Sequence, residues 1–339
     1  MNNNSELMGG KIGTDVELAA GLLRSGKPVG LPTETVYGLA ANGLDPNAIS
    51  QIFEIKNRPF FDPLILHVAS IQQAMEFTHS WSEEAKQLAA AFWPGPLTLV
   101  LPKNNLVPDL VTSGNPTVAV RIPNHSIALE LLQQLDFPLA APSANPFGYV
   151  SPTTAMHVFD QLGDKVPYIL DGGPCMRGLE STIVACLPNQ QPKILRLGSI
   201  SVHEISMVIG EIDESLTQNS NPSAPGQLDQ HYSPYCKLEA LENLTFAQTQ
   251  LPTTAKLAIL LFSKTKIQNQ LVDIDNFTPK IDKFYLSENG DTNQAAQQLF
   301  SMLRQFDALK YTHVWFEWAP ETGLGRAIND RLRRAAAKR

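Results

Sequence analysis

The sequence has little cysteine, little charge and no long apolar run, and each shortage excludes a class of protein. Its 339 residues include three cysteines, Cys175, Cys186 and Cys236, with no CxxC pair, which excludes a disulfide framework and a zinc site built mainly on thiolates. Apolar runs reach six residues, as in 257–262, whereas a membrane-spanning helix needs about 20. The opening MNNNSELMGG has neither a basic start nor an apolar stretch, so we expect no secretory signal peptide and a cytoplasmic protein.

Charged residues make up only 17% of the chain, and the formal net charge is −7. A protein that coats nucleic acid non-specifically is normally basic, so the composition argues against that class. The net charge of the chain does not, however, describe each segment. The last nine residues carry five cations, which are Arg331, Arg333, Arg334, Lys338 and Arg339. Cations at the end of a helix usually compensate its dipole and face water, and a basic contact surface is the alternative.

The pattern of apolar residues predicts two α/β domains joined by a linker. With 43% apolar residues the chain can bury large cores, so global disorder is excluded. Residues 1–211 alternate between extended and helical patterns, which predicts a mixed α/β domain with many strands. Residues 212–236 are polar, rich in Ser, Asn and Pro and without period, which is typical of a linker. Residues 237–339 alternate again and predict a small parallel sheet, Rossmann-like in outline.

Individual elements follow from the same pattern. In the first domain we expect strands at 29–33, 64–69, 97–102, 117–123, 139–145, 168–173, 181–186 and 193–198, and helices from Asp45-Pro46, over 82–93 and over 125–135. In the second we expect strands at 257–262, 283–287 and 312–318, and helices over 292–306 and from about residue 326. No GxGxxG follows the first of these strands, so a dinucleotide site is not expected there.

Cations are scarce in the first domain, and several lie at the ends of apolar segments. Lys56 and Arg58 follow the helix that Asp45-Pro46 opens, Arg121 interrupts TVAVRIP, and Arg196 interrupts KILRLG. A guanidinium in an apolar strand is costly unless it meets an anion. For each arginine alone, an edge-strand position facing water or a structural salt bridge is the alternative. Together, on an acidic chain, they favour a shared site for phosphate or carboxylate.

Polar turns follow two of the predicted strands. LPTETVYGLA at 31–40 contains Thr33, Glu34, Thr35 and Tyr37, and is either a ligand-binding segment or a strand-to-helix turn capped by hydroxyls. In APSANPFG at 141–148, two prolines brace a turn that holds polar side chains.

The loop DGGPCMRGLEST at 171–182 and the strand LILHVA carry further candidates. Gly172 and Gly173 permit close approach of a ligand to the backbone, and an ordinary hairpin-like loop is the alternative. Cys175 lies near Arg177, which would activate a thiol, although no histidine partner is near. His67 alternates with apolar residues, which fits a core histidine as well as a catalyst.

Taken together and in order, these segments resemble the YrdC-like family. The resemblance rests on LPTETVYGLA, KNRPFFDPLILHV, WPGPLTLVL, VAVRIPNH, APSAN and LDGGPC…GLESTIV. APGQLDQHYSP resembles the linker of the long, two-domain members, and GLGRAINDRLRRAA resembles the end of their C-terminal domain. Each motif alone has moderate specificity, but six in series plus the linker cover nearly the whole chain.

The resemblance implies a fold and an activity. It implies a twisted mixed sheet with a concave active-site cavity, a linker that closes over it as a lid, and a smaller Rossmann-like domain. The long members are threonylcarbamoyl-AMP synthases, nucleotidyltransferases that make L-threonylcarbamoyladenylate and pyrophosphate from L-threonine, bicarbonate or CO2, and ATP. Mg²⁺ would be held mainly by the ATP phosphates. The product feeds N6-threonylcarbamoyladenosine formation in tRNA, so a downstream tRNA threonylcarbamoyl-transferase complex is an expected partner. Direct tRNA binding is a further option, and no membrane partner is expected.

By motif match the resemblance also implies site residues. Those expected to line the L-threonine pocket are Thr35, His67, Arg121, Ala141 and Ser181. Those expected to hold ATP are Lys56, Arg58, Asp62, Thr117, Ser143, Asn145, Ser151, Arg196 and Tyr232. Lys56 and Arg58 are the expected catalytic residues, since they would neutralise charge growing on the phosphates. Tyr232 would reach back from the linker as part of the lid. An acid at Asp62 would repel phosphate unless a metal intervened.

Three other functions compete with this expectation. An RNA-binding module without turnover would use a positive concave surface, against which the net charge of −7 and the shortage of lysine in the first domain argue. A carbamoyltransferase that adenylates carbamoyl phosphate belongs to larger chains with zinc-finger-like and acylphosphatase parts, and this chain resembles neither part. A purely structural role leaves the arginines and polar turns unexplained.

Overall fold

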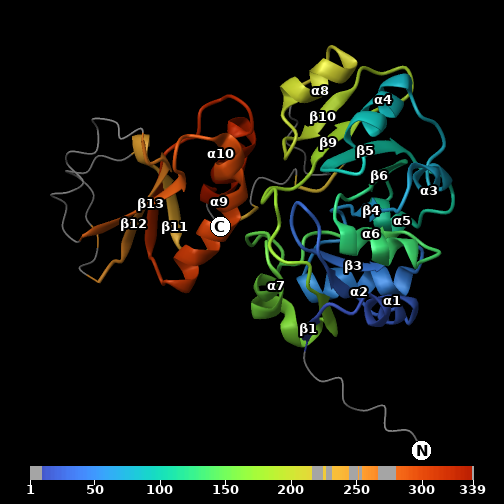
Figure 1. Cartoon of the computed structure of the whole chain (residues 1–339), viewed down its shortest axis with the longest axis horizontal. Helices are drawn as coiled ribbons and strands as arrows, with labels where there is room; N and C mark the ends of the chain where they lie inside the picture. Colours follow the sequence, from blue (N-terminus) through green and yellow to red (C-terminus); the bar gives the residue numbers. More distant parts are fainter. Residues whose placement is uncertain are drawn as a thin grey trace, which may run out of the picture. The chain divides into compact units, whose positions relative to one another are not determined.

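The computed structural model describes residues 10–215, 224–226, 231–243, 251, 254–265 and 280–337. The chain divides into two compact units (Figure 1). Unit 1 comprises Met1–Phe147 and Ser151–Leu228, and unit 2 comprises Gly148–Val150 and Asp229–Arg339. Within the described ranges, no helix combines the length and apolar character needed to cross a membrane.

Unit 1 is built on a ten-stranded sheet in the order β1-β8-β2-β3-β7-β4-β6-β5-β9-β10. Its strands are β1 (Lys11–Gly13), β2 (Val29–Leu31), β3 (Gly38–Asn42), β4 (Ile65–His67), β5 (Leu97–Pro102), β6 (Thr117–Arg121), β7 (Leu139–Ala140), β8 (Tyr168–Leu170), β9 (Thr182–Ala185) and β10 (Lys193–Arg196). Its helices are α1 (Val16–Arg24), α2 (Pro46–Lys56), α3 (Ile71–Glu76), α4 (Glu83–Phe92), α5 (Asp109–Thr112), α6 (Ser126–Gln133), α7 (Ala155–Leu162), α8 (Val202–Ile209) and the 3₁₀ turn η1 (Gly163–Lys165). The sheet contains both parallel and antiparallel pairs, which confirms the predicted mixed α/β class.

The helix expected from Asp45-Pro46 is confirmed, and its limits have local causes. The Asp45 side chain accepts a hydrogen bond from the Asn47 backbone N–H, and Pro46 occupies the first turn, where its missing donor costs nothing. The helix ends because Asn57 adopts the left-handed conformation at φ 51°. This end fixes the direction in which Lys56 and Arg58 leave α2.

Two loop interpretations from the sequence are wrong. The segment 31–40 is not a strand-to-helix turn, because it leads from β2 directly into β3, which pairs antiparallel with β2. The loop 171–182 is not hairpin-like, because β8 and β9 lie far apart in the strand order. Both loops instead connect strands across the end of the sheet at which Thr35 and Ser181 lie.

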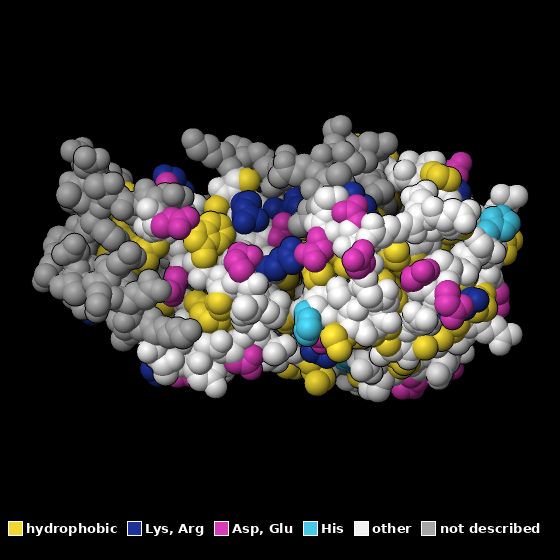
Figure 2. Space-filling view, turned by 90° about the horizontal axis from the view of Figure 1, so that it is seen from above, with side chains coloured by type: hydrophobic (Ala, Val, Ile, Leu, Met, Phe, Trp, Pro, Cys, Tyr) yellow, Lys and Arg dark blue, Asp and Glu magenta, His cyan; other side chains and the backbone are white. Residues whose placement is uncertain are grey.

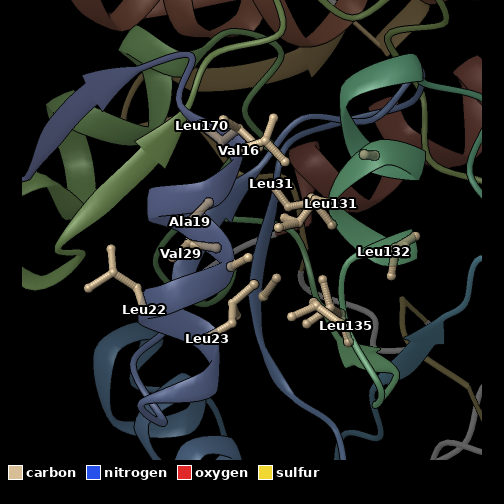
Figure 3. Packing of buried hydrophobic residues seen from close by; sticks show 14 of the residues in the cluster. Val16, Ala19, Leu22, Leu23, Val29, Leu31, Leu131, Leu132, Leu135 and Leu170 are labelled. Atoms are coloured by element: carbon tan, nitrogen blue, oxygen red, sulfur yellow. The ribbon is translucent and has the colours of Figure 1, made fainter.

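One face of the sheet is covered by α1 and α6. Figure 3 shows Leu22 and Leu23 of α1, Leu131 and Leu132 of α6, and Leu135 just after α6, packed with strand residues such as Val29. A second cluster comprises Ile65, Val100, Ala119, Ile183 and Ala224.

The second cluster marks the face of the sheet that carries the polar site. Side chains alternate between faces along a strand. His67 therefore shares the face of Ile65 two residues earlier, and Arg121 shares the face of Ala119. The buried Ala224, within the predicted linker, packs on this same face. The face is thus apolar in its middle and polar where β4 and β6 end.

Unit 2 contains a four-stranded sheet in the order β11-β14-β12-β13, and all its pairs are parallel, as the sequence predicts. The elements are β11 (Lys237–Ala240), the 3₁₀ turn η2 (Leu241–Asn243), β12 (Leu257–Ser263), β13 (Ile281–Ser287), α9 (Thr292–Ala308), β14 (His313–Phe316) and α10 (Gly325–Ala336). Figure 1 shows α9 and α10 on the same side of this sheet.

The cations of α10 are not simply a solvated helix end. Arg331 is fully buried, and its guanidinium lies 2.7 Å from Asp330 and over the ring of Tyr232. Arg334 also pairs with Asp330, at 3.1 Å, whereas Arg333 is exposed. Lys338 and Arg339 lie outside the described residues. The solvated reading is therefore wrong for Arg331, which is part of the core of unit 2.

Candidate active site

The ends of β4 and β6 bring together His67 and Arg121. The two strands are parallel, and His67 lies directly opposite Arg121 in their register. Both side chains are buried, at 4% and 3% exposure. Arg121 does not lie on an edge strand facing water, because β6 is inside the sheet between β4 and β5. A buried guanidinium at a strand end fits the predicted anion site.

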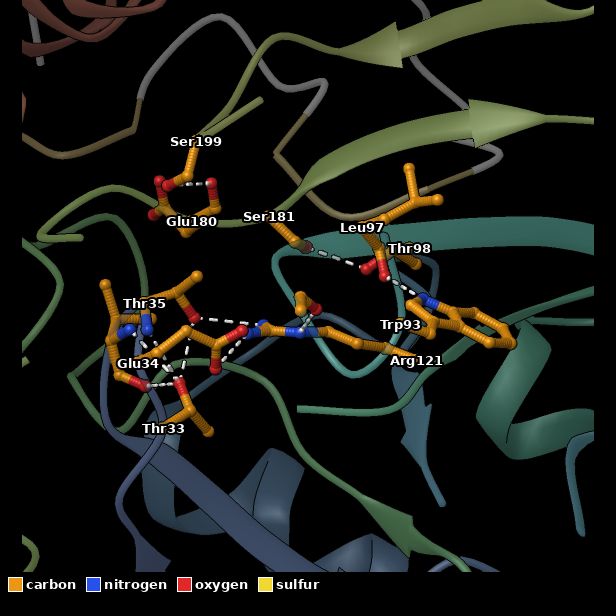
Figure 4. A network of polar contacts seen from close by, with 12 residues as sticks. Thr33, Glu34, Thr35, Trp93, Leu97, Thr98, Arg121, Glu180, Ser181 and Ser199 are labelled. Atoms are coloured by element: carbon orange, nitrogen blue, oxygen red, sulfur yellow. Dashed lines mark hydrogen bonds and ion pairs between the residues drawn. The ribbon is translucent and has the colours of Figure 1, made fainter. Parts of the chain in front are cut away.

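Arg121 is held by three groups from segments far apart in the sequence (Figure 4). Its Nη2 lies 2.7 Å from Glu34 Oε2, its Nη1 donates to Thr35 Oγ1 at 2.9 Å, and its Nε donates to the Gly95 carbonyl at 3.3 Å. Thr33 supports this arrangement, since its hydroxyl lies 2.8 Å from that of Thr35. The structural salt bridge considered for Arg121 therefore exists. It joins Arg121 to Glu34, which was not among the residues expected to line the threonine or ATP site.

His67 is neutral in this environment. Burial, and secondly the Arg121 charge, lower the pKa of His67 to about 3. Its Nδ1 lies 3.3 Å from the carbonyl oxygen of Ile65. Of this pair, Arg121 is therefore the cation and His67 a neutral imidazole.

Ser181 connects the two predicted residue sets. It immediately precedes β9, and its hydroxyl lies 2.7 Å from that of Thr98 on β5. Arg196, at the end of β10, donates from Nη2 to the Ser181 hydroxyl at 3.0 Å and also donates to the Ser181 carbonyl. Gly198 permits this approach, because a Cβ there would lie 2.4 Å from the backbone of Ser181.

Lys56 is clamped by the turn 141–148. Its Nζ donates to the carbonyl oxygens of Ser143, at 2.5 Å, and Asn145. Burial, and secondly the Arg58 charge, hold the pKa of Lys56 well below its ordinary value. Two N–H donors of Lys56 are thus engaged, one with each carbonyl oxygen. The backbone of Ser143 and Asn145 thus positions Lys56 directly.

Arg58 and Asp62 form a buried ion pair, 2.9 Å apart. Arg58 also donates to the Asp62 and Pro63 carbonyls. Burial raises the pKa of Asp62, while the charges of Arg58, Lys56 and Arg196 lower it. The structure therefore brings Lys56, Arg58 and Arg196 within electrostatic range of a single carboxyl, and cations outnumber acids in this cluster.

The remaining predicted residues of unit 1 are spread along the sheet. Ala141 follows β7 and packs in the apolar cluster of α1 and α6. Ser151 donates to Glu180 Oε1 at 2.8 Å. Thr117 begins β6, so it lies at the opposite end of that strand from Arg121, about 13 Å away at the usual rise per residue. The structure does not bring Thr117 and Arg121 together.

Tyr232 belongs to unit 2. Its side chain is fully buried, its ring stacks on that of Phe300 at 5.3 Å, and the Arg331 guanidinium lies 5.1 Å from its centroid. Its backbone has φ 64°, an uncommon left-handed conformation for a tyrosine. The aromatic ring is therefore part of a packed core, and its reach toward a nucleotide stays a prediction.

Two weaker candidates in the loop 171–182 have structural explanations. Burial raises the pKa of the Cys175 thiol far above its ordinary value, so the activated-thiol alternative is wrong. A Cβ at Gly172 would lie 2.4 Å from the His125 ring and 2.7 Å from Pro32, so packing accounts for this glycine without a ligand.

Comparison with known proteins covers both parts of the chain. Residues 21–198 match the family model described as "Telomere recombination", and residues 200–337 match the model described as "Threonylcarbamoyl-AMP synthase, C-terminal domain". The chain belongs to the threonylcarbamoyl-AMP synthase family. The resemblance found in the sequence is thereby confirmed.

Relatives in this family share nearly the full length of the chain. Threonylcarbamoyl-AMP synthase from Pyrococcus abyssi is 41% identical over 96% of this chain and 94% of that protein. The enzyme of the same name from Bacillus subtilis is 38% identical over 95% of this chain and 92% of that protein. The crystal structure of P. abyssi Sua5 complexed with L-threonine superposes with a TM-score of 0.81, at 38% identity over 95% of this chain and 94% of that one.

Among the residues that hold the site together, the sequence reasoning missed Glu34, Thr98 and Glu180. Glu34 lies between Thr33 and Thr35 in the motif LPTETVYGLA, but the motif indicated no role of its own for this residue. Its burial, at 4% exposure, distinguishes it from an ordinary solvent-exposed turn residue. Thr98 gave no signal, since it is one polar residue in an otherwise apolar strand. A pairing between residues 83 positions apart is visible only once β5 and β9 are seen as neighbours.

Proposed function

We propose that this protein forms L-threonylcarbamoyladenylate and pyrophosphate from L-threonine, bicarbonate and MgATP, as a nucleotidyltransferase of the cytoplasm. The observation that carries the proposal is the 3.0 Å contact between Ser181 and Arg196. It joins the residues expected to hold threonine to those expected to hold the triphosphate. A shared name in two relatives and the L-threonine complex of the P. abyssi protein support the choice of substrate.

At the threonine end, Arg121 is the group that would receive the carboxylate. A guanidinium offers five N–H donors. The contacts to Glu34, Thr35 and Gly95 use three of them, one on each nitrogen atom. Its burial makes the contact with a carboxylate strong and directional. The hydroxyl of Thr35, which contacts Arg121, and the hydroxyl of Ser181, which contacts Arg196, would orient the rest of the amino acid.

At the phosphate end, Lys56, Arg58 and Arg196 would hold the triphosphate and stabilise the charge that develops as pyrophosphate leaves. Mg²⁺ would enter as part of MgATP. Over the described ranges, no group of three or more His, Cys, Asp or Glu residues is placed to hold a metal, so the phosphate oxygens would be its main ligands. The Asp62 carboxylate is already paired with Arg58, so it would not be a main ligand of this ion.

These residues would support the reaction by positioning the reactants. Threonine takes up bicarbonate to give N-carboxythreonine, whose carbamate oxygen attacks the α-phosphorus of ATP and displaces pyrophosphate. The protein contributes by holding an unstable carbamate against the nucleotide, an effect worth several kcal/mol. The adenylate then passes to a tRNA threonylcarbamoyl-transferase complex.

The direct test uses the full chain with ATP, Mg²⁺ and bicarbonate, with and without L-threonine. We expect pyrophosphate release that requires both threonine and bicarbonate, and a product with the mass of threonylcarbamoyl-adenylate. L-Serine and L-valine serve as matched amino acids that lack the methyl or the hydroxyl group of threonine. A folded protein that binds ATP but releases no pyrophosphate contradicts the proposal.

The RNA-binding alternative predicts a different result, which is salt-dependent binding of tRNA without turnover. On the face shown in Figure 2, Asp and Glu side chains are interspersed among Lys and Arg side chains. Of the cations described in α10, Arg331 is buried and Arg334 is paired. We therefore favour the enzyme.

A further inference from the structure

Glu34 is a buried acid that the proposed reaction has not yet used. Its side chain is 5% exposed, and its Oε2 lies 2.7 Å from Arg121 Nη2. Apart from this ion pair, neither carboxylate oxygen accepts a hydrogen bond from any described residue. A buried carboxylate normally makes several hydrogen bonds, so this one has the capacity to accept more.

The pair Glu34 and Arg121 has the charge pattern of a receptor for an amino acid. A zwitterionic α-amino acid presents an ammonium and a carboxylate separated by one carbon atom. A site that binds both needs a carboxylate and a guanidinium side by side, within a few ångströms. Glu34 and Arg121 meet that requirement, and Thr35 fixes the guanidinium through its hydroxyl.

We propose that Glu34 binds the α-ammonium group of the amino acid and accepts the proton that must leave before the carbamate forms. This inference rests on the proposed function. The threonine carboxylate then lies on Arg121, so that one buried ion pair recognises both ends of the zwitterion.

The proton balance of the step is complete. The ammonium gives one proton to Glu34 and becomes a neutral amine. Its nitrogen attacks the carbon of bicarbonate, the C–N bond forms, and the C–OH bond breaks. The departing hydroxide takes a second proton from that nitrogen and leaves as water. The products are the carbamate, water and protonated Glu34, which returns its proton to solvent when the site opens.

The neighbouring titratable groups leave Glu34 as the proton acceptor. His67 faces Arg121 from β4, and its burial, and secondly the Arg121 charge, oppose its protonation. The Cys175 thiol lies near Glu34 and Arg121, and its burial keeps it protonated. Arg177 contacts Glu34 only through the backbone, by donating its N–H to the Glu34 carbonyl. Among these groups, Glu34 is the carboxylate that an ammonium would meet.

The test is calorimetric binding of two ligands to the wild type and to Glu34→Gln. L-Threonine carries the ammonium, whereas (2S,3R)-2,3-dihydroxybutanoate has a hydroxyl in its place. We expect Glu34→Gln to weaken L-threonine at least tenfold, by about one charge-assisted hydrogen bond, and to leave the hydroxy acid within about twofold. Glu54→Gln removes an exposed acid on α2 and is the control.

Turnover gives a second readout. With Glu34→Gln, the kcat/KM for L-threonine should fall about 100-fold at pH 7 and recover as the pH rises toward the pKa of the free amine, because the variant must use amine already deprotonated in water. Glu34→Asp, which keeps the charge, should retain more of the discrimination between the two ligands than Glu34→Gln.

Each other outcome overturns the assignment. Equal weakening of both ligands by Glu34→Gln means that Glu34 only braces Arg121. Unchanged L-threonine binding means that the ammonium lies elsewhere. If the folded wild type binds no L-threonine, the proposed function fails and this role fails with it. Circular dichroism and thermal unfolding of each variant identify a loss of fold before binding is compared.

Discussion

His67 and Arg121 lie opposite each other on adjacent parallel strands, and both side chains are buried. Burial, and secondly the charge of the Arg121 guanidinium beside it, lower the pKa of His67 and keep its imidazole neutral at pH 7. The strand register therefore places a permanent cation and a permanently neutral ring at one end of the sheet.

The buried histidine should make stability depend on pH. Its pKa is about 3 in the folded protein, against 6.5 in the unfolded chain, so the unfolded state alone binds the proton between these values. The stabilisation is fully present above pH 6.5 and is lost as the pH falls, with a slope of about 1.4 kcal/mol per pH unit from this one group. Urea unfolding from pH 7 to pH 4.5 measures it. His67→Asn should flatten the slope, and His203→Asn, on the surface of α8, is the control.

Lys56→Met should lower kcat about 100-fold, since it removes the amino group that the Ser143 and Asn145 carbonyls hold and that we propose to contact the triphosphate. Lys56→Arg should not restore the rate, because a planar guanidinium does not fit the place of a point charge held by two carbonyls. Pyrophosphate release measures the effect. Lys86→Met, at an exposed site on α4, should behave as wild type. Full activity of Lys56→Met would remove Lys56 from the site.

Asp62→Asn should lower the KM for MgATP several-fold. The substitution removes a negative charge from among Arg58, Lys56 and Arg196 and frees the Arg58 guanidinium from its ion pair. Initial rates at varied MgATP measure this. Asp109→Asn, which removes an exposed acid paired with Lys103, is the matched control. A rise in KM instead would mean that Asp62 helps to hold the metal of MgATP.

Ser181→Ala should raise the KM for both L-threonine and ATP, by about tenfold each. The hydroxyl contacts Arg196 and Thr98, so its loss disturbs both halves of the site at once. A change in only one KM would show that the two halves are independent. Ser50→Ala, which removes a hydroxyl on the outer surface of α2, tests whether any serine loss has this effect.

Asp307→Ala should destabilise unit 2. The Asp307 carboxylate accepts hydrogen bonds from the Tyr149 hydroxyl at 2.6 Å and from the backbone N–H groups of Tyr235 and Cys236. Each lost bond to a charged acceptor costs about 1.5–3 kcal/mol, so the thermal unfolding temperature of unit 2 should fall by many degrees. Glu288→Ala, which removes one partner of an exposed ion pair, should leave this unfolding temperature unchanged.

Apolar periodicity predicted most of the strands, whereas the elements not predicted were β1, β3 and β11 and the helices α1, α3, α5, α7 and α8. Strands with long apolar runs, such as β5 and β12, were found at nearly their observed limits. β1 and β3 were missed, because β1 has three residues and β3 reads GLAAN, with no β-branched residue. Their pairing in the sheet, and not local preference, makes them strands.

The site was predicted by residue type but not by partner. The sequence pointed to Arg121 and Arg58 because cations in apolar segments need anions. It could not reveal that Glu34 pairs with Arg121 across 87 positions, or that Asp62 already neutralises Arg58. The pairing of Glu34 with Arg121 depends on strand order, which alternation along one strand does not encode. The pairing of Arg58 with Asp62, four residues apart, depends on the conformation of the loop after α2.

The strand order also fixes when, during synthesis, the site can exist. β1 at Lys11–Gly13 pairs with β8 at Tyr168–Leu170, and one edge of β5 pairs with β9 at Thr182–Ala185. Both pairings therefore need strands that are synthesised much later. The ribosome must therefore release almost all of unit 1 before Ser181 and Arg196 can meet. Until then the nascent chain carries unpaired strand edges, so the sheet of unit 1 is completed only after its last strands have been synthesised.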